Sequence, residues 1–432
     1  MTHKVLTGAI VASFSFFSLS ISAQNASTRS EHRQEVIETV RVHHPGGEAD
    51  TSADSIKSLI ENFYLDQFRQ FHDPDAPTFM LMSKDANIAL GVGGKAIVRG
   101  WADWNGSQSS PSFYPYSIAI PKDPTAMRSF DASFDKTSLF VSLLGRSAKI
   151  RYMVYLQAEV SNSNFILKKA YINLNDFTVG LASTTFSDDD ALAPTVDAQG
   201  PNGKTSKTQI LGRYFHTFSN GFSLAGAVEV PNSYQASVEG QTAPCTDFIP
   251  DIVALAQYGW GDSHVRASGI MRTMTYRDLL TETNHNVIGW GAQLSTVIDI
   301  ARPLTFYFTA VGGRGIGSYQ GDLSKGQYDL VGDSRHPGKM IAPWSMGITT
   351  GLKYQFSPKV FSSVSFGQQR YFLKHRLTDD QYKYGLYGAA NVFWKISPRF
   401  LAGLEYIVGK RMNYNHTHGA QNRVDAMVSY SF

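Results

Sequence analysis

The most constraining feature of this chain is a period-two alternation of apolar and polar side chains that runs from Asn87 to Phe432. Between Lys149 and Val160, the even-numbered residues are apolar or aromatic and the odd-numbered ones are mostly charged or polar. Successive side chains of a strand point to opposite faces, so one face of such a segment suits lipid and the other suits water. Repeated segments of this kind, separated by Gly, Pro, Asn, Asp and Ser, predict a transmembrane β-barrel.

The number and spacing of these segments also fit a barrel, because about sixteen of them can be counted and bacterial barrels have an even number of strands. Short connections such as Ser219-Asn220 alternate with long ones at 105–127, 185–206 and 318–341. Trp101 and Trp104 fit an aromatic girdle at the membrane interface. The segments are approximately 87–104, 128–145, 147–161, 163–174, 176–184, 207–218, 220–231, 249–260, 262–276, 285–299, 302–317, 342–356, 358–372, 381–396, 398–413 and 420–432.

A soluble β-sandwich or propeller is the competing fold, since its half-buried strands also alternate. The persistence of the apolar faces, the alternation of short and long connections and the ending Tyr430-Ser431-Phe432 all favour the barrel. Phe432 resembles the signal by which the barrel assembly machinery recognises its clients, so that machinery is an expected partner during biogenesis. The predicted fold class is all-β, an antiparallel transmembrane barrel with a short N-terminal helix and an inward-folded constriction loop.

Composition agrees with this fold. Only 17% of the residues are charged, yet the mean hydropathy is −0.20, which excludes a helical membrane protein. A barrel explains both values, because the lipid face and the wet face of each strand average along the sequence. The 39 basic and 36 acidic residues give a net charge of only +3, so nucleic acid is not an expected partner.

The region before the barrel domain at 87–432 divides into three parts. Residues 1–23 have Lys4, an apolar stretch and a small-residue junction at Ala23, as in a secretory signal peptide. Residues 24–50 are polar and expected to be flexible, and 51–86 contain apolar residues at near-helical spacing that predict a periplasmic helix and lead-in. Whether this helix oligomerises, plugs the barrel or merely packs stays open. Cys245 is the only cysteine, so no disulfide framework is expected.

The connection at 182–206 is the candidate constriction loop. A barrel of about sixteen strands encloses a lumen wide enough for water, so an internal constriction is expected to set selectivity. This connection mixes turn residues with Leu192 and Val196, which could pin it to the inner wall. It also carries four carboxylates, Asp188, Asp189, Asp190 and Asp197.

Two sequence runs in this loop resemble the inward-folded third loop of DcaP-like porins, relatives of the phosphate-selective porins O and P. They are Gly180-Leu-Ala-Ser-Thr-Thr-Phe-Ser-Asp-Asp-Asp-Ala-Leu-Ala-Pro-Thr195 and Asp197-Ala-Gln-Gly-Pro-Asn-Gly203. Asp75-Ala-Pro77, Leu90-Gly-Val-Gly-Gly94, Arg99-Gly-Trp101 and Phe432 extend the similarity over most of 75–432. The resemblance implies a homotrimer of outer-membrane channels for small, preferentially anionic solutes. It also implies a helical periplasmic extension, from which this chain departs because 53–72 is rich in Phe and Tyr.

Strand parity places basic side chains on the wet face, since an Arg or Lys facing lipid at the bilayer midplane costs about 2–4 kcal/mol. Opposite the acidic loop, such residues would create a transverse field that favours anions without chemistry or energy input. Each could instead brace the barrel through a salt bridge in the lumen. The predicted pore-lining residues are Lys95, Arg99, Arg128, Lys149, Arg151, Lys169, Arg213, Arg266 and Arg272.

Other functions compete with a channel. An adhesive or structural outer-membrane barrel would have a blocked lumen, and a barrel-wall hydrolase would need a nucleophile motif beside His216 or His264, which the sequence does not show. The Asp188 to Asp190 triplet could bind calcium, but it lacks the spaced oxygen ligands of a known loop. No catalytic residue, metal or cofactor is therefore predicted. The expected location is the outer membrane, with lipid around the barrel and small anionic solutes inside.

Overall fold

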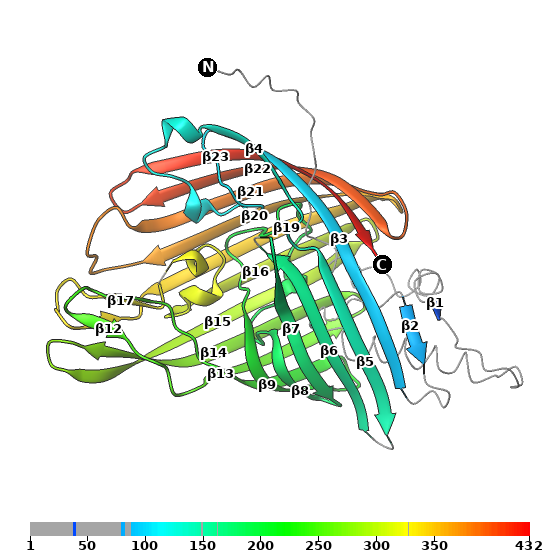
Figure 1. Cartoon of the computed structure of the whole chain (residues 1–432), viewed down its shortest axis with the longest axis horizontal. Helices are drawn as coiled ribbons and strands as arrows, with labels where there is room; N and C mark the ends of the chain where they lie inside the picture. Colours follow the sequence, from blue (N-terminus) through cyan, green and yellow to red (C-terminus); the bar gives the residue numbers. More distant parts are fainter. Residues whose placement is uncertain (1–37, 40–78, 83–87, 148–149, 162, 327) are drawn as a thin grey trace, which may run out of the picture.

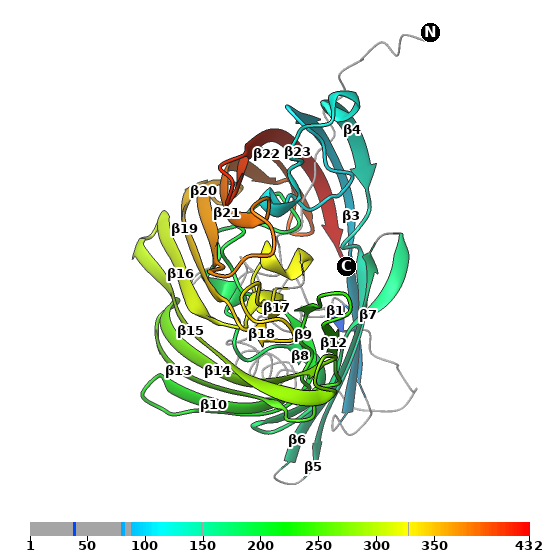
Figure 2. The same ribbon diagram turned by 90° about the vertical axis from the view of Figure 1, so that its left-hand side faces the viewer.

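The computed structural model describes residues 38–39, 79–82, 88–147, 150–161, 163–326 and 328–432. These residues form a closed antiparallel barrel of 16 strands, which confirms the predicted fold class (Figures 1 and 2). The predicted signal peptide, polar segment and N-terminal helix lie outside the described residues, apart from 38–39 and 79–82. Within the described part, no helix is long and apolar enough to cross a membrane.

The strands of the barrel wall follow one another in chain order, and each pairs with the next. In this order β4 and β5 share one place beside β3, whereas β1, β2 and β12 add only short pairings to the wall. The short strands β11, β17 and β18 form a separate three-stranded sheet. The strands are β1 Glu38–Thr39, β2 Phe79–Met82, β3 Ile88–Trp104, β4 Arg128–Ser133, β5 Ser138–Ser147, β6 Ile150–Ser161, β7 Asn164–Leu174, β8 Phe177–Ser183, β9 Thr208–Thr217, β10 Phe222–Glu229, β11 Gln235–Ala236, β12 Thr242–Pro244, β13 Asp251–Trp260, β14 Ser263–Asp278, β15 Thr283–Ala301, β16 Leu304–Arg314, β17 Leu330–Gly332, β18 Met340–Ile341, β19 Trp344–Ser357, β20 Val360–Phe372, β21 Tyr382–Lys395, β22 Phe400–Asn413 and β23 His418–Ser431. Single 3-10 turns occur at Pro115–Ser117, Pro124–Ala126, Asp189–Ala191, Gly317–Tyr319 and Leu323–Lys325.

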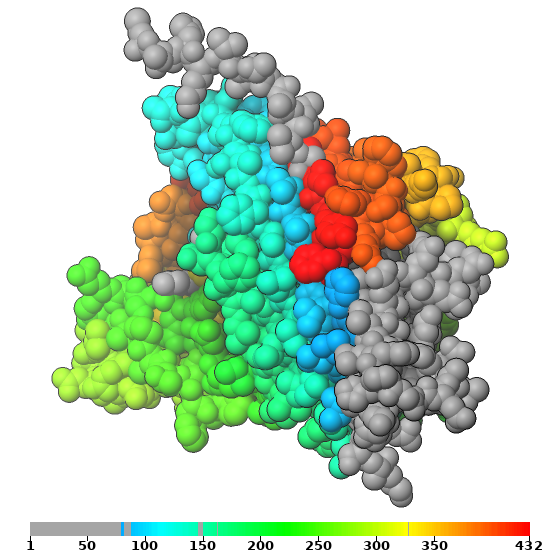
Figure 3. Space-filling model, turned by 45° about the vertical axis from the view of Figure 1, so that its right-hand side comes forward, coloured from blue at the N-terminus to red at the C-terminus, as the bar shows by residue number. Residues whose placement is uncertain are grey.

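The last strand closes the barrel against the first. β23 pairs antiparallel with β3, from Ser431 opposite Lys95 to Asn422 opposite Trp104. Figure 3 shows the red β23 lying directly against the blue β3. The backbone amide of Phe432 donates to the carbonyl of Gly94 at 2.9 Å, and the reverse bond is 2.7 Å long. The C-terminal residue therefore completes the ladder, and beyond it the short β2 occupies the same edge of β3.

One predicted strand is divided in the structure. The segment at 128–145 forms β4 and β5, which pair with the upper and lower parts of β3. Lys136, in the turn between them, has a φ of +74°, a left-handed conformation that interrupts a strand. Alternation continues on both sides of the turn, which is why the sequence reads as one segment.

Inward and outward faces follow the predicted parity. On β3, Val98 is 57% exposed toward the lipid side, whereas its neighbour Arg99 is completely buried in the interior. Trp104 stacks on Tyr406 of the outer face. Trp101 does not belong to this girdle, because it shares the parity of Arg99 and its indole nitrogen donates to the carbonyl of Gln108 inside the barrel. The interface prediction is thus wrong for Trp101.

Candidate functional site

The barrel interior contains the connection between β8 and β9, here called the internal loop, residues 184–207. Its first residues are fixed to β10, where Glu229 accepts hydrogen bonds from the hydroxyl of Thr184 at 2.6 Å and the amide of Thr185 at 2.7 Å. The carbonyl of Phe186 then accepts from Ser268 on β14 at 2.8 Å. The loop therefore leaves β8 and runs along the inner faces of the later strands, as the sequence predicts for a constriction loop.

Asp188 anchors the next part of the internal loop to two strands. Its Oδ2 lies 2.9 Å from Nε2 of His264 on β14 and accepts from the hydroxyl of Ser295 on β15 at 2.5 Å. The guanidinium of Arg266 lies 3.4 Å from its Oδ1 and donates to the carbonyl of Ser187 at 3.1 Å. Serine and histidine both face the carboxylate here. In a catalytic arrangement, the serine would contact the histidine that serves as its base. Here both side chains bind Asp188, so the three residues hold the loop in place.

The far end of the internal loop is anchored at β22. The carboxylate of Glu405 accepts from the amides of Val196 and Asp197, both at 2.8 Å, and from the side chain of Asn391 on β21 at 2.7 Å. The side chain of Asp197 accepts from the amide of Phe113, in the connection after β3, at 2.8 Å. The predicted loop residue Asp197 is therefore buried, and it joins two loops instead of facing a bore.

A second long connection, residues 315–343 between β16 and β19, also folds inward. In Figure 2 its yellow 3-10 turns lie within the ring of strands. Arg272 of β14 joins this connection to the wall: its Nε donates to Asp251 at 2.9 Å, and its Nη1 lies 3.2 Å from Asp329. The aromatic ring of Tyr319 stacks beneath the same guanidinium at 4.9 Å. Arg272 is thus a structural ion-pair residue.

Asp322 links the two inward loops. Its carboxylate accepts from the amide group of Asn202 at 2.7 Å and from the hydroxyl of Tyr382 at 2.8 Å. Burial favours the neutral form of a carboxyl group and raises the pKa of Asp322 to about 6, although these hydrogen bonds oppose the shift. The contact between the loops is therefore sensitive to pH between about 4 and 6.

Two more of the predicted pore-lining arginines are buried where the inward loops pack against the strands. Arg99 on β3 faces the carboxylates of Asp425 and Asp197, and none of the described residues accepts a hydrogen bond from its guanidinium. Arg213 on β9 donates to the carbonyl of Ser183 at 3.3 Å. Both lie on the predicted inner face but are enclosed by the internal loop or its ends.

The structure also contains an ion pair that the sequence analysis did not single out. Arg423 of β23 makes a bidentate contact with Asp103 of β3, with nitrogen–oxygen distances of 2.8 and 2.9 Å. Both residues have inward parity, which was the available signal. Their pairing depends on barrel closure, since 320 residues separate them in the sequence.

The inner face of the wall from β3 to β7 carries partly exposed basic residues. We call it the basic wall, formed by Lys95, Lys136, Glu159, Lys168 and Lys169. The Nζ of Lys136 lies 2.8 Å from Glu159, and that of Lys168 lies 3.7 Å from the same carboxylate. Both lysine side chains are 32% exposed, and Lys95 and Lys169 are half-buried. Here lysines outnumber the acidic group and retain access to solvent.

Lys168 was not predicted to face the interior, because it has the wrong parity. In the pairing of β6 and β7, Gln157 lies opposite Lys169, but the next pair is Ala158 with Leu167. Lys168 is therefore the extra residue of a β-bulge, which lets two consecutive side chains turn inward. The adjacent Lys-Lys pair was visible in the sequence, but nothing in it placed the bulge.

The remaining predicted basic residues lie elsewhere. Arg128 is exposed and pairs with Trp104, on the face opposite Arg99, so the prediction that it reaches the lumen is wrong. The parity of β4 follows from its register with β3 and could not be read from the preceding loop. Arg151 is exposed at the start of β6, where its backbone amide donates to the side chain of Asn175. Lys149 lies outside the described residues.

The three adjacent aspartates have different environments. Asp188 is buried in its anchor, whereas Asp189 and Asp190 in the following 3-10 turn are half-buried. The charge of Asp189 acts on Lys168 of the basic wall and on Lys204 at the end of the internal loop. Because Asp188 is occupied by His264 and Ser295, the triplet does not converge as a set of calcium ligands would.

Comparison with known families agrees with this architecture. The model of the DcaP outer membrane protein family matches residues 102–432, which include the barrel from the end of β3 to the C-terminus. The chain belongs to the DcaP outer membrane protein family. This confirms the resemblance inferred from the internal loop and places the protein in the outer membrane as a barrel of the porin type.

Solved structures show how widely this fold is shared. The outer membrane channel DcaP of Acinetobacter baumannii superposes with a TM-score of 0.68 at 18% identity, over 82% of this chain and 99% of that one. The outer membrane protein OmpT of Vibrio cholerae gives 0.52 at 10% identity, over 82% and 99%. An anion-selective porin from Comamonas acidovorans gives 0.51 at 9% identity, over 80% and 100%. No curated protein matches this DcaP-family chain.

Proposed function

We propose that this DcaP-family barrel is a passive diffusion channel for small hydrophilic solutes with a preference for anions. The basic wall carries the proposal. In this region of the described interior, lysines outnumber carboxylates and keep exposed side chains, with Glu159 shared by Lys136 and Lys168. The DcaP channel and the anion-selective porin named above support the class of function through a shared fold.

The strand register brings the charges of the basic wall together. Lys95 on β3 pairs with Ser138 on β5, which pairs with Glu159 on β6, so the three lie side by side across neighbouring strands. Lys168 reaches the same carboxylate from β7. The positive charges thus gather on neighbouring strands, where an anion would meet several of them together.

Selectivity follows from the field between the basic wall and the internal loop. Asp189 and Asp190 supply negative charge from the loop side, and lysines supply positive charge from the strands. Fixed opposite charges orient a dipolar solute and lower the energy of an anion near the lysines, with no chemical step. The excess of lysines sets the sign of the preference.

The test is a reversal potential measured across planar bilayers in a KCl gradient. We expect a chloride-to-potassium permeability ratio above one, and a lower ratio for the Lys168→Ala, Lys169→Ala double variant. Lys359→Ala is the matched control, because this exposed lysine lies in the short turn between β19 and β20, away from the basic wall. Its ratio should equal that of the unmodified channel.

Two outcomes would contradict the proposal. A wild-type ratio at or below one would exclude anion preference, and an absence of conductance steps would favour a structural or adhesive barrel with a blocked lumen. The same preparation tests the proposed homotrimer, since a trimeric porin migrates as a larger species on gels when it is not heated.

A further inference from the structure

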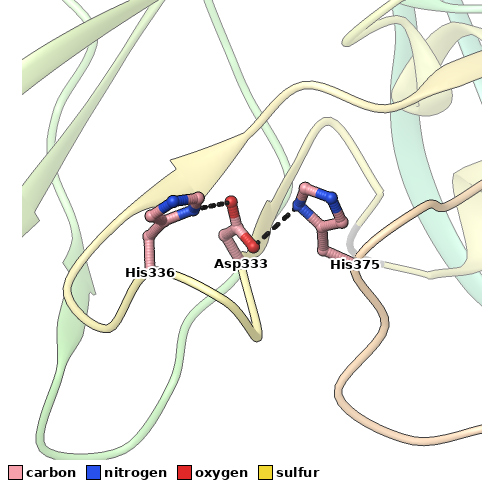
Figure 4. Close-up of side chains that lie close together, drawn as sticks. All are labelled: Asp333, His336 and His375. Atoms are coloured by element: carbon pink, nitrogen blue, oxygen red, sulfur yellow. Dashed lines mark hydrogen bonds and ion pairs between the residues drawn. The ribbon is translucent and has the colours of Figure 1, made fainter.

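Three potential metal ligands converge at the long-loop end of the barrel. Asp333 and His336 lie in the connection 315–343, between β17 and β18, and His375 lies in the connection 373–381 after β20. Figure 4 shows the carboxylate of Asp333 between the two imidazoles. Its oxygens lie 2.8 Å from Nδ1 of His336 and 3.0 Å from Nδ1 of His375. In the part of the chain that the structure describes, this is the one such group that could hold a metal ion.

The backbone holds these side chains in place. The amide of His336 donates to the carbonyl of Asp333 at 3.2 Å, which forms a tight turn, and the amide of Asp333 donates to the carbonyl of Lys339 at 2.9 Å. A hydrogen bond of 3.4 Å from the amide of Ser334 to the carbonyl of His375 joins the two connections. The ligands therefore come from two loops that are already in contact, so little ordering is needed to bind an ion.

The donor set indicates which ion would bind. Two imidazole nitrogens and one carboxylate oxygen suit Zn²⁺ and similar transition ions, whereas Ca²⁺ and Mg²⁺ prefer oxygen ligands. Zinc–ligand bonds of about 2.0–2.2 Å in tetrahedral geometry separate the ligand atoms by roughly 3.3–3.6 Å. All three candidate atoms lie within 4.8 Å of one another, so small side-chain rotations would complete the site.

The exposure of the three side chains leaves the site accessible to an ion. Asp333 is 6% exposed at its side chain, while those of His375 and His336 are 28% and 58% exposed, so the site opens to solvent on the histidine side. Nδ1 of His375 and Nδ1 of His336 both lie against the carboxylate of Asp333, at 3.0 and 2.8 Å. An ion bound between the three groups would be coordinated by these two nitrogens and one carboxylate oxygen.

We propose that Asp333, His336 and His375 bind one Zn²⁺ ion, with water or a solute anion at the fourth position. The ion would join the connection 315–343, which reaches into the barrel through Tyr319 and Leu323, to the connection 373–381. This site goes beyond solute passage, and its test does not depend on conductance.

The experiment titrates Zn²⁺ into the full-length barrel in detergent against a chromogenic zinc chelator. We expect one equivalent to bind saturably, and His336→Ala and His375→Ala each to weaken the binding at least tenfold. His416→Ala is the matched control, because His416 is an exposed histidine in the neighbouring connection after β22. It should leave the affinity unchanged.

X-ray absorption at the zinc edge gives a second measurement, with two imidazole ligands expected in the coordination sphere. His336 is largely exposed, so His336→Ala is expected to fold, and wild-type mobility on an unheated gel checks this. Absence of saturable binding, or equal affinity in the wild type and both site variants, would overturn the proposal and leave only hydrogen-bonded side chains at this position.

Discussion

Lys168 on β7 and Arg272 on β14 both point into the barrel, yet their surroundings differ completely. Lys168 shares one carboxylate with Lys136 and is 32% exposed. Arg272 has no exposed side-chain surface and contacts Asp251 and Asp329. The difference teaches that the position of a residue along its strand decides whether its charged side chain points into the barrel. The inward loops then decide whether a solute can reach that side chain.

The largest effect that tests this comparison is expected for Arg272→Ala. Removing one partner of a buried ion pair leaves uncompensated charge, here on Asp251 and Asp329, and costs about 3–5 kcal/mol. The free energy of unfolding in urea and lipid vesicles measures this loss. Arg277→Ala, on the same strand but bonded to Asn284 at the surface, serves as the control. Equal losses in the two variants would show that burial does not separate the two kinds of charge.

A smaller effect is expected at the far anchor of the internal loop. Glu405→Ala leaves the buried amides of Val196 and Asp197 without an acceptor, at about 1–3 kcal/mol. Hydrogen exchange at these amides should become roughly ten- to hundredfold faster while the strand amides stay protected. Glu239→Ala, at an exposed position, should change neither. Unaltered protection at Val196 would mean that other contacts suffice to hold the loop.

The contact between the two inward loops should depend on pH. The pKa of Asp322 is raised to about 6, so the folded loop binds a proton more tightly than the opened loop and loses stability as pH rises through this value. Between about pH 4 and 6, the opening equilibrium around 317–326 should rise by up to tenfold per pH unit. Hydrogen exchange corrected for intrinsic rates measures it. Asp322→Asn should remove the dependence, and a pH profile that this substitution leaves intact would rule out Asp322 as its source.

The smallest change in stability is expected on the basic wall. Lys168→Ala should alter the free energy of unfolding by less than about 0.5 kcal/mol, because Lys136 still pairs with Glu159 and the site is solvated. Its anion preference should nevertheless fall. A Lys168→Ala variant that loses stability but keeps its anion preference would contradict the role assigned to Lys168 in this comparison with Arg272.

Period-two alternation predicted the barrel and the inward direction of Arg99, Arg266 and Arg272, because lipid excludes charge from the other face. Their partners could not be predicted, since Asp329 and Asp188 reach them through loops whose paths leave no periodic signal. The candidate constriction loop was found from its turn residues and its resemblance to a family. Its burial against the wall required the structure.

Local irregularities account for the other differences. One extra residue in β7 brings Lys168 inward, and a one-residue change of parity places Arg128 outward beside Trp104. Because the side-chain period is two, a single inserted residue reverses the face of everything after it until the register recovers. The alternation pattern therefore predicted the existence and the faces of whole strands, but not the faces of single residues beside a bulge or a turn.

The anchoring of the internal loop at β22 has a consequence for the order of assembly. Val196 and Glu405 are 209 residues apart, and the contact exists only after β22 has taken its place in the wall. Contacts between such distant positions form after local ones, since a long chain segment must first be ordered. During biogenesis the strands must therefore come together around an interior that is still wide, and the narrowing of the passage is one of the last steps of maturation.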